Sequence, residues 1–315
     1  MLAGTETAMN EQSSPLPATL QDRLRGGRFV MTAELAPPVS CAAADLRQKA
    51  AGLQGLPDAV NVTDGAGARA HMAALAAAAI LIDMGIEPIL QITCRDKNRI
   101  ALQSEMMGAA ALGVRNLLLL TGDDPKAGDQ PDTKPVFDID SKTLIETARR
   151  LRDDGTLPTG RKVAGKAAFF LGAADLPIDP PAGWQSNSLL GKIKTGAQFA
   201  QTQFCMDAGV VRRYVGALEA AGITRQLFVL IGVNPLRSAK SAAWMKSHLF
   251  GTIIADAFIE RMEKAADPAS EGIGICVELI EELATIPGVA GVHIMAPGND
   301  AAIPQVIAAA RAKLR

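Results

Sequence analysis

Cysteine and histidine are scarce in this sequence. Its 315 residues include four cysteines and three histidines. The cysteines lie far apart and form no Cys-x-x-Cys pair, so neither a zinc site nor a disulfide framework is indicated. The histidines are equally scattered, which argues against a histidine-rich metal site. We therefore expect no bound metal, and we expect most of the cysteines to be small core residues.

The sequence also lacks an excess of charge of either sign and lacks long apolar runs. The 32 basic and 33 acidic residues leave a formal net charge of −1, so there is no electrostatic reason to expect nucleic acid or an anionic membrane as a partner. The alanine-rich run 72–82 ends at Asp83, well short of a membrane span, and no signal-like start precedes Gly26. We expect no membrane partner and a cytoplasmic enzyme or binding protein.

The sequence does contain a repeated alternation of strand and helix patterns. Residues 1–18 are small and polar and predict a flexible N-terminal arm, whereas 19–315 are expected to form one domain. Nearly continuous apolar runs predict eight strands, at 27–35, 58–63, 88–93, 116–120, 167–172, 199–204, 226–232 and 291–295. Helical patterns separate them, with extra helices before the last strand. This α/β alternation predicts a (β/α)8 TIM-type barrel, in which working residues lie at the carboxyl ends of the strands.

Three polar side chains at these strand ends are candidates for function. Glu34 precedes two prolines, and it could either act chemically or form a salt bridge at the rim. Asp123 lies in a Thr-Gly-Asp-Asp-Pro segment and could be only a turn former. Gln203 lies inside an apolar strand, where a buried amide needs partners that a ligand often supplies. No lysine ends a strand, so a Schiff-base aldolase has no obvious nucleophile, and no glycine-rich phosphate loop follows a strand.

Six segments together resemble methylenetetrahydrofolate reductases in their order and spacing. They are Glu34-Leu-Ala-Pro-Pro38, Asn61-Val-Thr63-Asp-Gly, Gln91-Ile-Thr-Cys94, Leu119-Leu-Thr-Gly-Asp123, Lys192-Ile-Lys-Thr-Gly-Ala197 and Gln201-Thr-Gln-Phe204. The resemblance covers roughly 28–300. It implies a flavin-bearing barrel that interconverts 5,10-methylenetetrahydrofolate and 5-methyltetrahydrofolate, with NAD(P)H as co-substrate and tetrahydrofolate derivatives as partners.

The same resemblance implies a role for individual residues. Glu34 matches the general acid that opens the imidazolidine ring, Asp123 matches an aspartate that contacts the pterin near the flavin, and Gln203 matches a folate-binding glutamine. The residues that match cofactor-contacting positions are Thr63, Gln91, Leu120, Thr121, Gly122, Asp123, Phe137 and Lys192.

Departures from the family pattern fall mainly on the cofactor side. Gln91 stands where many members carry histidine, Thr121 and Gly191 stand where arginine is common, and Phe137 replaces a usual tyrosine. FAD is the implied cofactor, with FMN or no flavin as alternatives. A flavin-independent reductase with direct hydride transfer from NADH, and a non-catalytic folate-binding subunit that serves a methyltransferase, therefore stay open. A barrel lyase with the same strand-end pattern is a further alternative, and the alanine-rich helices also allow a homo-oligomer.

Overall fold

The computed structural model describes residues 18–314 and has the predicted barrel at its centre. The barrel strands are β1 (Val30–Leu35), β2 (Ala59–Val62), β3 (Pro88–Thr93), β4 (Asn116–Leu120), β5 (Phe170–Asp175), β6 (Phe199–Met206), β7 (Phe228–Val233) and β9 (Val289–Ile294). Each strand pairs in parallel with the next, and β9 pairs with β1 to close the ring. The (β/α)8 architecture is thus confirmed. The arm predicted for 1–18 lies, apart from Ala18, outside the described residues.

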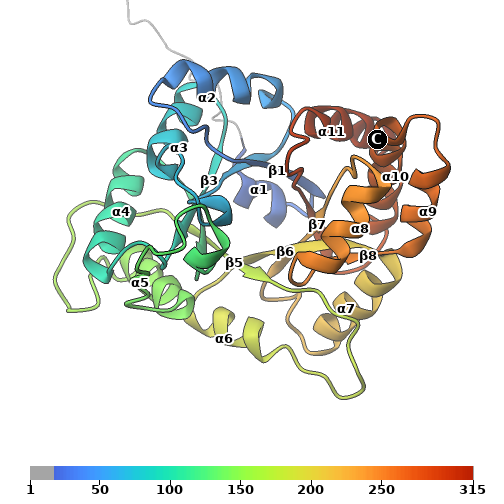
Figure 1. Cartoon of the computed structure of the whole chain (residues 1–315). Coiled ribbons are helices and arrows are strands. Elements are labelled where there is room, and N and C mark those ends of the chain that lie inside the picture. Colours follow the sequence, from blue (N-terminus) through green and yellow to red (C-terminus); the bar gives the residue numbers. More distant parts are fainter. Residues whose placement is uncertain (1–17, 315) are drawn as a thin grey trace, which may run out of the picture.

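Helices surround the strands (Figure 1). They are α1 (Leu20–Arg25), α2 (Ala43–Ala50), α3 (Ala74–Asp83), α4 (Arg99–Ala111), α5 (Ser141–Asp153), α6 (Asn187–Thr195), α7 (Ala208–Ala220), α8 (Ala239–His248), α9 (Asp256–Lys264), α10 (Pro268–Leu283) and α11 (Ala302–Lys313), with short 3-10 turns η1 (Ala51–Leu53), η2 (Ala66–Ala68) and η3 (Pro125–Ala127). The predicted extra helices before the last strand are α8, α9 and α10. A two-residue strand, β8 (Ile253–Ile254), lies between α8 and α9 and pairs with β6. None of the described helices is both long and apolar enough to cross a membrane.

The C-terminal helix α11 was not predicted from the sequence. Pro304 lies in its first turn, where a backbone N–H has no partner within the helix, so proline is tolerated there. The helix packs against η1, and Gly52 in η1 lies close to the Pro304 ring. The C-terminal helix therefore packs beside the turn that follows α2.

The fifth strand lies three residues later than predicted. The prediction ended the strand at Gly172, but the strand continues to Asp175. Gly172 faces the barrel interior, where a Cβ atom would lie only 2.3 Å from Cζ of Phe199. The glycine thus leaves room for a neighbouring ring and does not terminate the strand. As a result, Asp175 lies at the carboxyl end of β5.

The amino-terminal end of the barrel is closed by apolar side chains. Leu20 and Leu24 of α1 pack against residues from the first halves of the strands, and the rings of Phe170 and Phe199 stack with centroids 4.8 Å apart. Beside this plug the fully buried carboxylate of Asp58 accepts hydrogen bonds from Met31 N at 2.8 Å and from Arg23 Nη1 at 2.7 Å. Apolar side chains thus fill the barrel axis at this end, and the candidate site lies at the opposite end.

Candidate active site at the carboxyl ends of the strands

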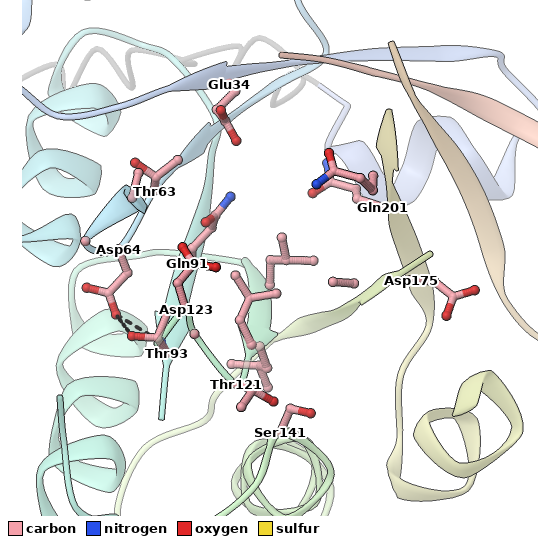
Figure 2. Close-up of a pocket in the computed structure, with 18 of the residues that line it drawn as sticks. Glu34, Thr63, Asp64, Gln91, Thr93, Thr121, Asp123, Ser141, Asp175 and Gln201 are labelled. Atoms are coloured by element: carbon pink, nitrogen blue, oxygen red, sulfur yellow. Dashed lines mark hydrogen bonds between the residues drawn. The ribbon is translucent and has the colours of Figure 1, made fainter. Parts of the chain in front are cut away.

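A cavity of about 440 Å³ lies at the carboxyl ends of the strands. It is lined by side chains from most of the barrel, among them Glu34 of β1, Gln91 of β3, Gln201 and Gln203 of β6, and His293 of β9. Figure 2 shows several of these side chains around the cavity. The structure therefore brings together residues that are up to 261 positions apart in the sequence, between Glu34 and Met295.

Glu34 occupies the position expected of an acid at a barrel mouth. It is the second-last residue of β1, and a quarter of its side chain is exposed. Its Oε2 lies 3.9 Å from Nε2 of the buried His293, across the β1–β9 strand pair. The carboxyl group is therefore reachable from the cavity and has a titratable neighbour behind it.

A chain of buried polar side chains continues from His293 across the barrel interior. His293 Nδ1 lies 3.0 Å from Thr32 Oγ1, and Gln201 Nε2 donates to the same oxygen at 3.1 Å. The amides of Gln201 and Asn61 exchange two hydrogen bonds, of 2.6 and 3.0 Å. Thr32, Asn61 and Gln201 were not predicted to be interior residues. Their signal was a polar side chain at an inward position of an otherwise apolar strand.

Gln203 was expected to be the buried amide of β6, but that residue is Gln201. Gln203 is half-buried and lies where the β6–β7 register shifts between Gln201 and Phe204. A bulge of this kind redirects a side chain, and bulges are frequent beside active sites. Its Oε1 accepts from Phe204 N at 3.0 Å, and its Nε2 faces Phe250 O at 3.4 Å. The amide of Gln203 thus lies at the rim of the cavity.

Asp123 lies on the loop after β4 and is exposed to the cavity. The preceding Gly122 has φ +95°, and a Cβ there would lie within about 3 Å of Arg95 and Thr93, so glycine is required for this close approach. The hydrogen bond from Arg95 to Asp96 raises the pKa of Arg95, and the charges of Asp123 and Asp64 add to that effect. Asp123 therefore has a cationic neighbour that is 4% exposed.

Several predicted cofactor residues line the same cavity. They are Thr63, Gln91, Leu120, Thr121 and Gly122. Thr63 Oγ1 is buried and has no hydrogen-bond partner in the described structure, so it is available to a water molecule or a ligand in the cavity. Phe137 does not line this cavity; it is 40% exposed and its backbone N–H bonds to Cys94 O at 3.2 Å. Its predicted role stays a prediction.

Lys192 and Asp175 face each other on the β5–α6 side of the site. Lys192 Nζ donates to Ala174 O, and burial lowers the pKa of Lys192. Burial raises the pKa of Asp175, while a hydrogen bond from the Tyr214 hydroxyl opposes that shift. Both residues also line an adjoining groove of about 430 Å³. A phosphate in this groove would meet one cationic lining residue, Lys192, which already has the Asp175 carboxyl as a neighbour.

A larger cavity of about 1050 Å³ opens on the β6–β7 side. It is lined by two aromatic side chains of the segment from α8 to β8, Trp244 and Phe250, which are 53% and 83% exposed. Arg69 and Arg237 lie on its rim. Glu34, Asp123 and Gln203 line both this cavity and the first one. The described residues contain no group of three or more His, Cys, Asp or Glu side chains that could hold a metal.

The fold and the site define a class: a (β/α)8 barrel with a polar pocket at the carboxyl ends of its strands, the position at which barrel enzymes bind their substrates. Within that class, the chain belongs to the methylenetetrahydrofolate reductase family, whose profile matches residues 19–311.

The chain is also similar to individual proteins. A Caenorhabditis elegans protein named "Probable methylenetetrahydrofolate reductase (NADPH)" is 23% identical over 239 residues, which are 73% of this chain and 33% of the relative. The chain thus spans about a third of that relative's length. A Clostridium thermocellum protein, described as binding two copies of 5-methyl-5,6,7,8-tetrahydrofolic acid, superposes with a TM-score of 0.64 at 12% identity, covering 93% of this chain and 98% of that one. DmoA from Hyphomicrobium sulfonivorans superposes with a TM-score of 0.55 at 10% identity, covering 91% of this chain and 89% of that one. At these identities the two structures show a shared fold.

Proposed function

We propose that the chain interconverts 5,10-methylenetetrahydrofolate and 5-methyltetrahydrofolate, with NAD(P)H as the source of reducing equivalents. One observation carries the proposal. The three residues that match the family's folate-site positions, Glu34, Asp123 and Gln203, come from three different strand ends and line both cavities together. The folate-binding neighbour and the name of the worm relative support the same reaction.

Each of the three side chains has a task that its position suits. Glu34 donates a proton to the bridging nitrogen, which opens the five-membered ring to an iminium cation that can accept hydride. Asp123 lies across the cavity mouth, where its carboxylate stabilises that cation. Gln203 presents an amide at the rim, which suits a hydrogen bond to the pterin or to the adjacent aminobenzoyl group.

The wider cavity suits the dinucleotide and the part of folate beyond the pterin. Trp244 and Phe250 offer exposed aromatic faces for planar rings. Arg69 and Arg237 on the rim supply positive charge near phosphate or carboxylate groups. This arrangement agrees with NADH or NADPH as co-substrate.

The first cavity fits the ring of a flavin better than it fits a diphosphate. Thr63, Gln91 and the 120–123 segment would hold the ring, with the unpartnered hydroxyl of Thr63 available to it. Lys192 would be the phosphate contact. When bound, the flavin would supply a hydride carrier between NAD(P)H and folate. The protein's part is to bind both ligands in turn and to hold the proton on Glu34.

Direct hydride transfer without a flavin is the second candidate. Asp175 favours it, because a carboxylate beside Lys192 opposes a diphosphate in the adjoining groove. In that case the nicotinamide and the folate occupy the two joined cavities together.

The absorption spectrum of the purified protein, followed by chromatography of the released small molecule, separates these candidates. A yellow protein that releases FAD or FMN and gives parallel double-reciprocal lines supports the flavin route. A colourless protein that oxidises NAD(P)H with methylenetetrahydrofolate and gives intersecting lines supports direct transfer. Folate binding without any NAD(P)H oxidation would overturn the proposed reaction and favour a non-catalytic folate-binding subunit.

A further inference from the structure

The buried Arg95 lies where three loops of the first cavity meet. It follows β3 by two residues, lines the cavity and is 4% exposed. An arginine is almost never buried to this extent unless its charge is paired. The partners of its N–H donors therefore show which parts of the site this residue holds in place.

The guanidinium group of Arg95 is bonded on two sides. Its Nε and Nη2 atoms donate to the two carboxylate oxygens of Asp96, at 2.8 and 2.6 Å, in a bidentate pair. Its Nη1 atom donates to the carbonyl oxygen of Gly65, in the loop after β2, at 3.2 Å. Because Asp96 is the next residue in the chain, this pair balances the charge of Arg95 locally and fixes the side chain.

Two glycines allow the neighbouring loops to approach Arg95 from either side. A Cβ atom on Gly65 would lie 2.3 Å from Arg95 Nη2, and one on Gly122, after β4, would lie 3.0 Å from Arg95 Cβ. Both glycines have positive φ, +62° and +95°. The carbonyl oxygen of Arg95 accepts from Val136 N at 2.7 Å. Arg95 thus connects the loops after β2, β3 and β4, and it meets the last of these at two points.

Asp123 directly follows Gly122, so its position in the cavity depends on this packing. The charge of Asp123 reaches Arg95, where it adds to the larger effect of Asp96 in raising the pKa of the guanidinium. Since the bidentate side of Arg95 is already occupied by Asp96, the carboxylate of Asp123 stays available to a cation that forms in the cavity.

Resting on the proposed function, we infer that Arg95 is a positioning residue for the reaction. It holds the loop after β4 against the loops after β2 and β3, and so fixes the Asp123 carboxylate where the iminium cation forms. Arg95 acts through this loop and not through contact with folate. Its loss therefore weakens stabilisation of the cation, which is measured in kcat, more than folate binding, which is measured in KM.

A double-mutant cycle tests whether Arg95 acts through Asp123. Arg95→Met removes all hydrogen bonds of the guanidinium and should lower kcat roughly tenfold, the worth of about one hydrogen-bonded contact, with little change in the KM for folate. Asp123→Asn should lower kcat about a hundredfold. When Asp123→Asn is already present, Arg95→Met should cause no further loss. Additive losses in the double variant overturn the inference.

Arg99 provides a matched control at the start of α4. It forms a similar bidentate pair with Asp138, from Nε at 2.7 Å and from Nη2 at 2.8 Å, but it does not line the cavity. Arg99→Met should leave kcat per folded molecule unchanged. A loss equal to that of Arg95→Met would reflect a general loosening of the loops and would contradict a specific role for Arg95.

Arg95→Lys separates position from charge. Lysine keeps the positive charge, but its single ammonium group cannot form the bidentate pair and reach the Gly65 carbonyl at the same time. The kcat of Arg95→Lys should therefore stay close to that of Arg95→Met. Full recovery of kcat by lysine would mean that charge alone is required, which overturns the inference.

Asp96→Asn is the milder variant if Arg95→Met folds poorly. An amide has one acceptor oxygen in place of two, so the pair loses a hydrogen bond while Arg95 stays in the chain. kcat should fall by a smaller factor than in Arg95→Met, and it should not fall further when Asp123→Asn is present. Equal losses in both backgrounds contradict the inference. Absence of folate-dependent NAD(P)H oxidation in the wild type is a different result, because it overturns the proposed function itself.

Discussion

The two ends of the barrel are built from the same eight strands but are filled in opposite ways. At the amino-terminal end, Leu20, Leu24 and Phe199 seal the axis, and the charged Asp58 is fully paired. At the carboxyl end, polar side chains face two connected cavities, and Thr63 is left without a partner. The closed end therefore contributes stability, and the open end gives up some stability in exchange for groups that are free to meet a ligand. Substitutions at the two ends should separate the two properties.

The largest expected effect is on activity at the open end. Glu34→Gln removes the proposed proton donor and should lower folate-dependent turnover about a thousandfold, within the range for general acids. Any oxidation of NAD(P)H by bound flavin alone should persist.

Glu87 is the matched control for this variant. It is a glutamate at the closed end that accepts from Leu20 N and Asn116 Nδ2. Glu87→Gln should leave turnover per folded molecule unchanged. Comparable turnover losses in the two variants would refute the division between the ends.

The next effect is on stability at the closed end. Asp58 pairs with Arg23 at 2.7 Å and with Arg311 at 3.0 Å. Asp58→Ala leaves these partners uncompensated, so the free energy of unfolding in urea should fall by about 3 kcal/mol, as for other broken buried pairs. Turnover per folded molecule should stay the same. Asp179→Ala, which removes an exposed pair with Arg213, should leave the free energy of unfolding nearly unchanged.

A smaller loss of stability is expected from a substitution in the barrel interior, between the two ends. Gly172→Ala places a methyl group against the Phe199 ring and should lower the free energy of unfolding by about 2 kcal/mol through overpacking. Gly216→Ala in α7 meets no atom within 4 Å and should raise it by about 0.5 kcal/mol. Equal effects of the two substitutions would show that Phe199 has room to move.

The smallest effect is a pH dependence at Glu87. Burial raises the pKa of this carboxyl above its ordinary value of 4.5. A raised folded pKa means that the favourable contribution is present below the ordinary value and is lost as pH rises through the folded pKa. The melting temperature of Glu87→Gln, relative to wild type, should therefore rise with pH across this window. A melting-temperature difference that stays constant with pH would argue against a raised pKa of Glu87.

The barrel and part of the site could be predicted from the sequence because they depend on local patterns. Apolar runs separated by helical segments gave the strand count, and the rule that barrel sites lie at strand ends brought Glu34, Asp123 and Gln203 to one place. Asp175 could not be placed there, because Gly172 looks like a strand end until Phe199 is known to lie above it. The buried hydrogen-bonded network that links Asn61, Gln201, Thr32 and His293 could not be predicted either, since it depends on the register of β1 with β2 and β9.

Three polar side chains that line both cavities, Glu34, Asp123 and Gln203, would also make the two proposed binding events interdependent. An occupant of one cavity that shifts or protonates Glu34, Asp123 or Gln203 would alter the other cavity at the same atoms, because these side chains line both. The affinities must then be coupled by a single factor that is the same in both directions. Folate should change the dissociation constant of the nicotinamide nucleotide by the factor by which the nucleotide changes that of folate.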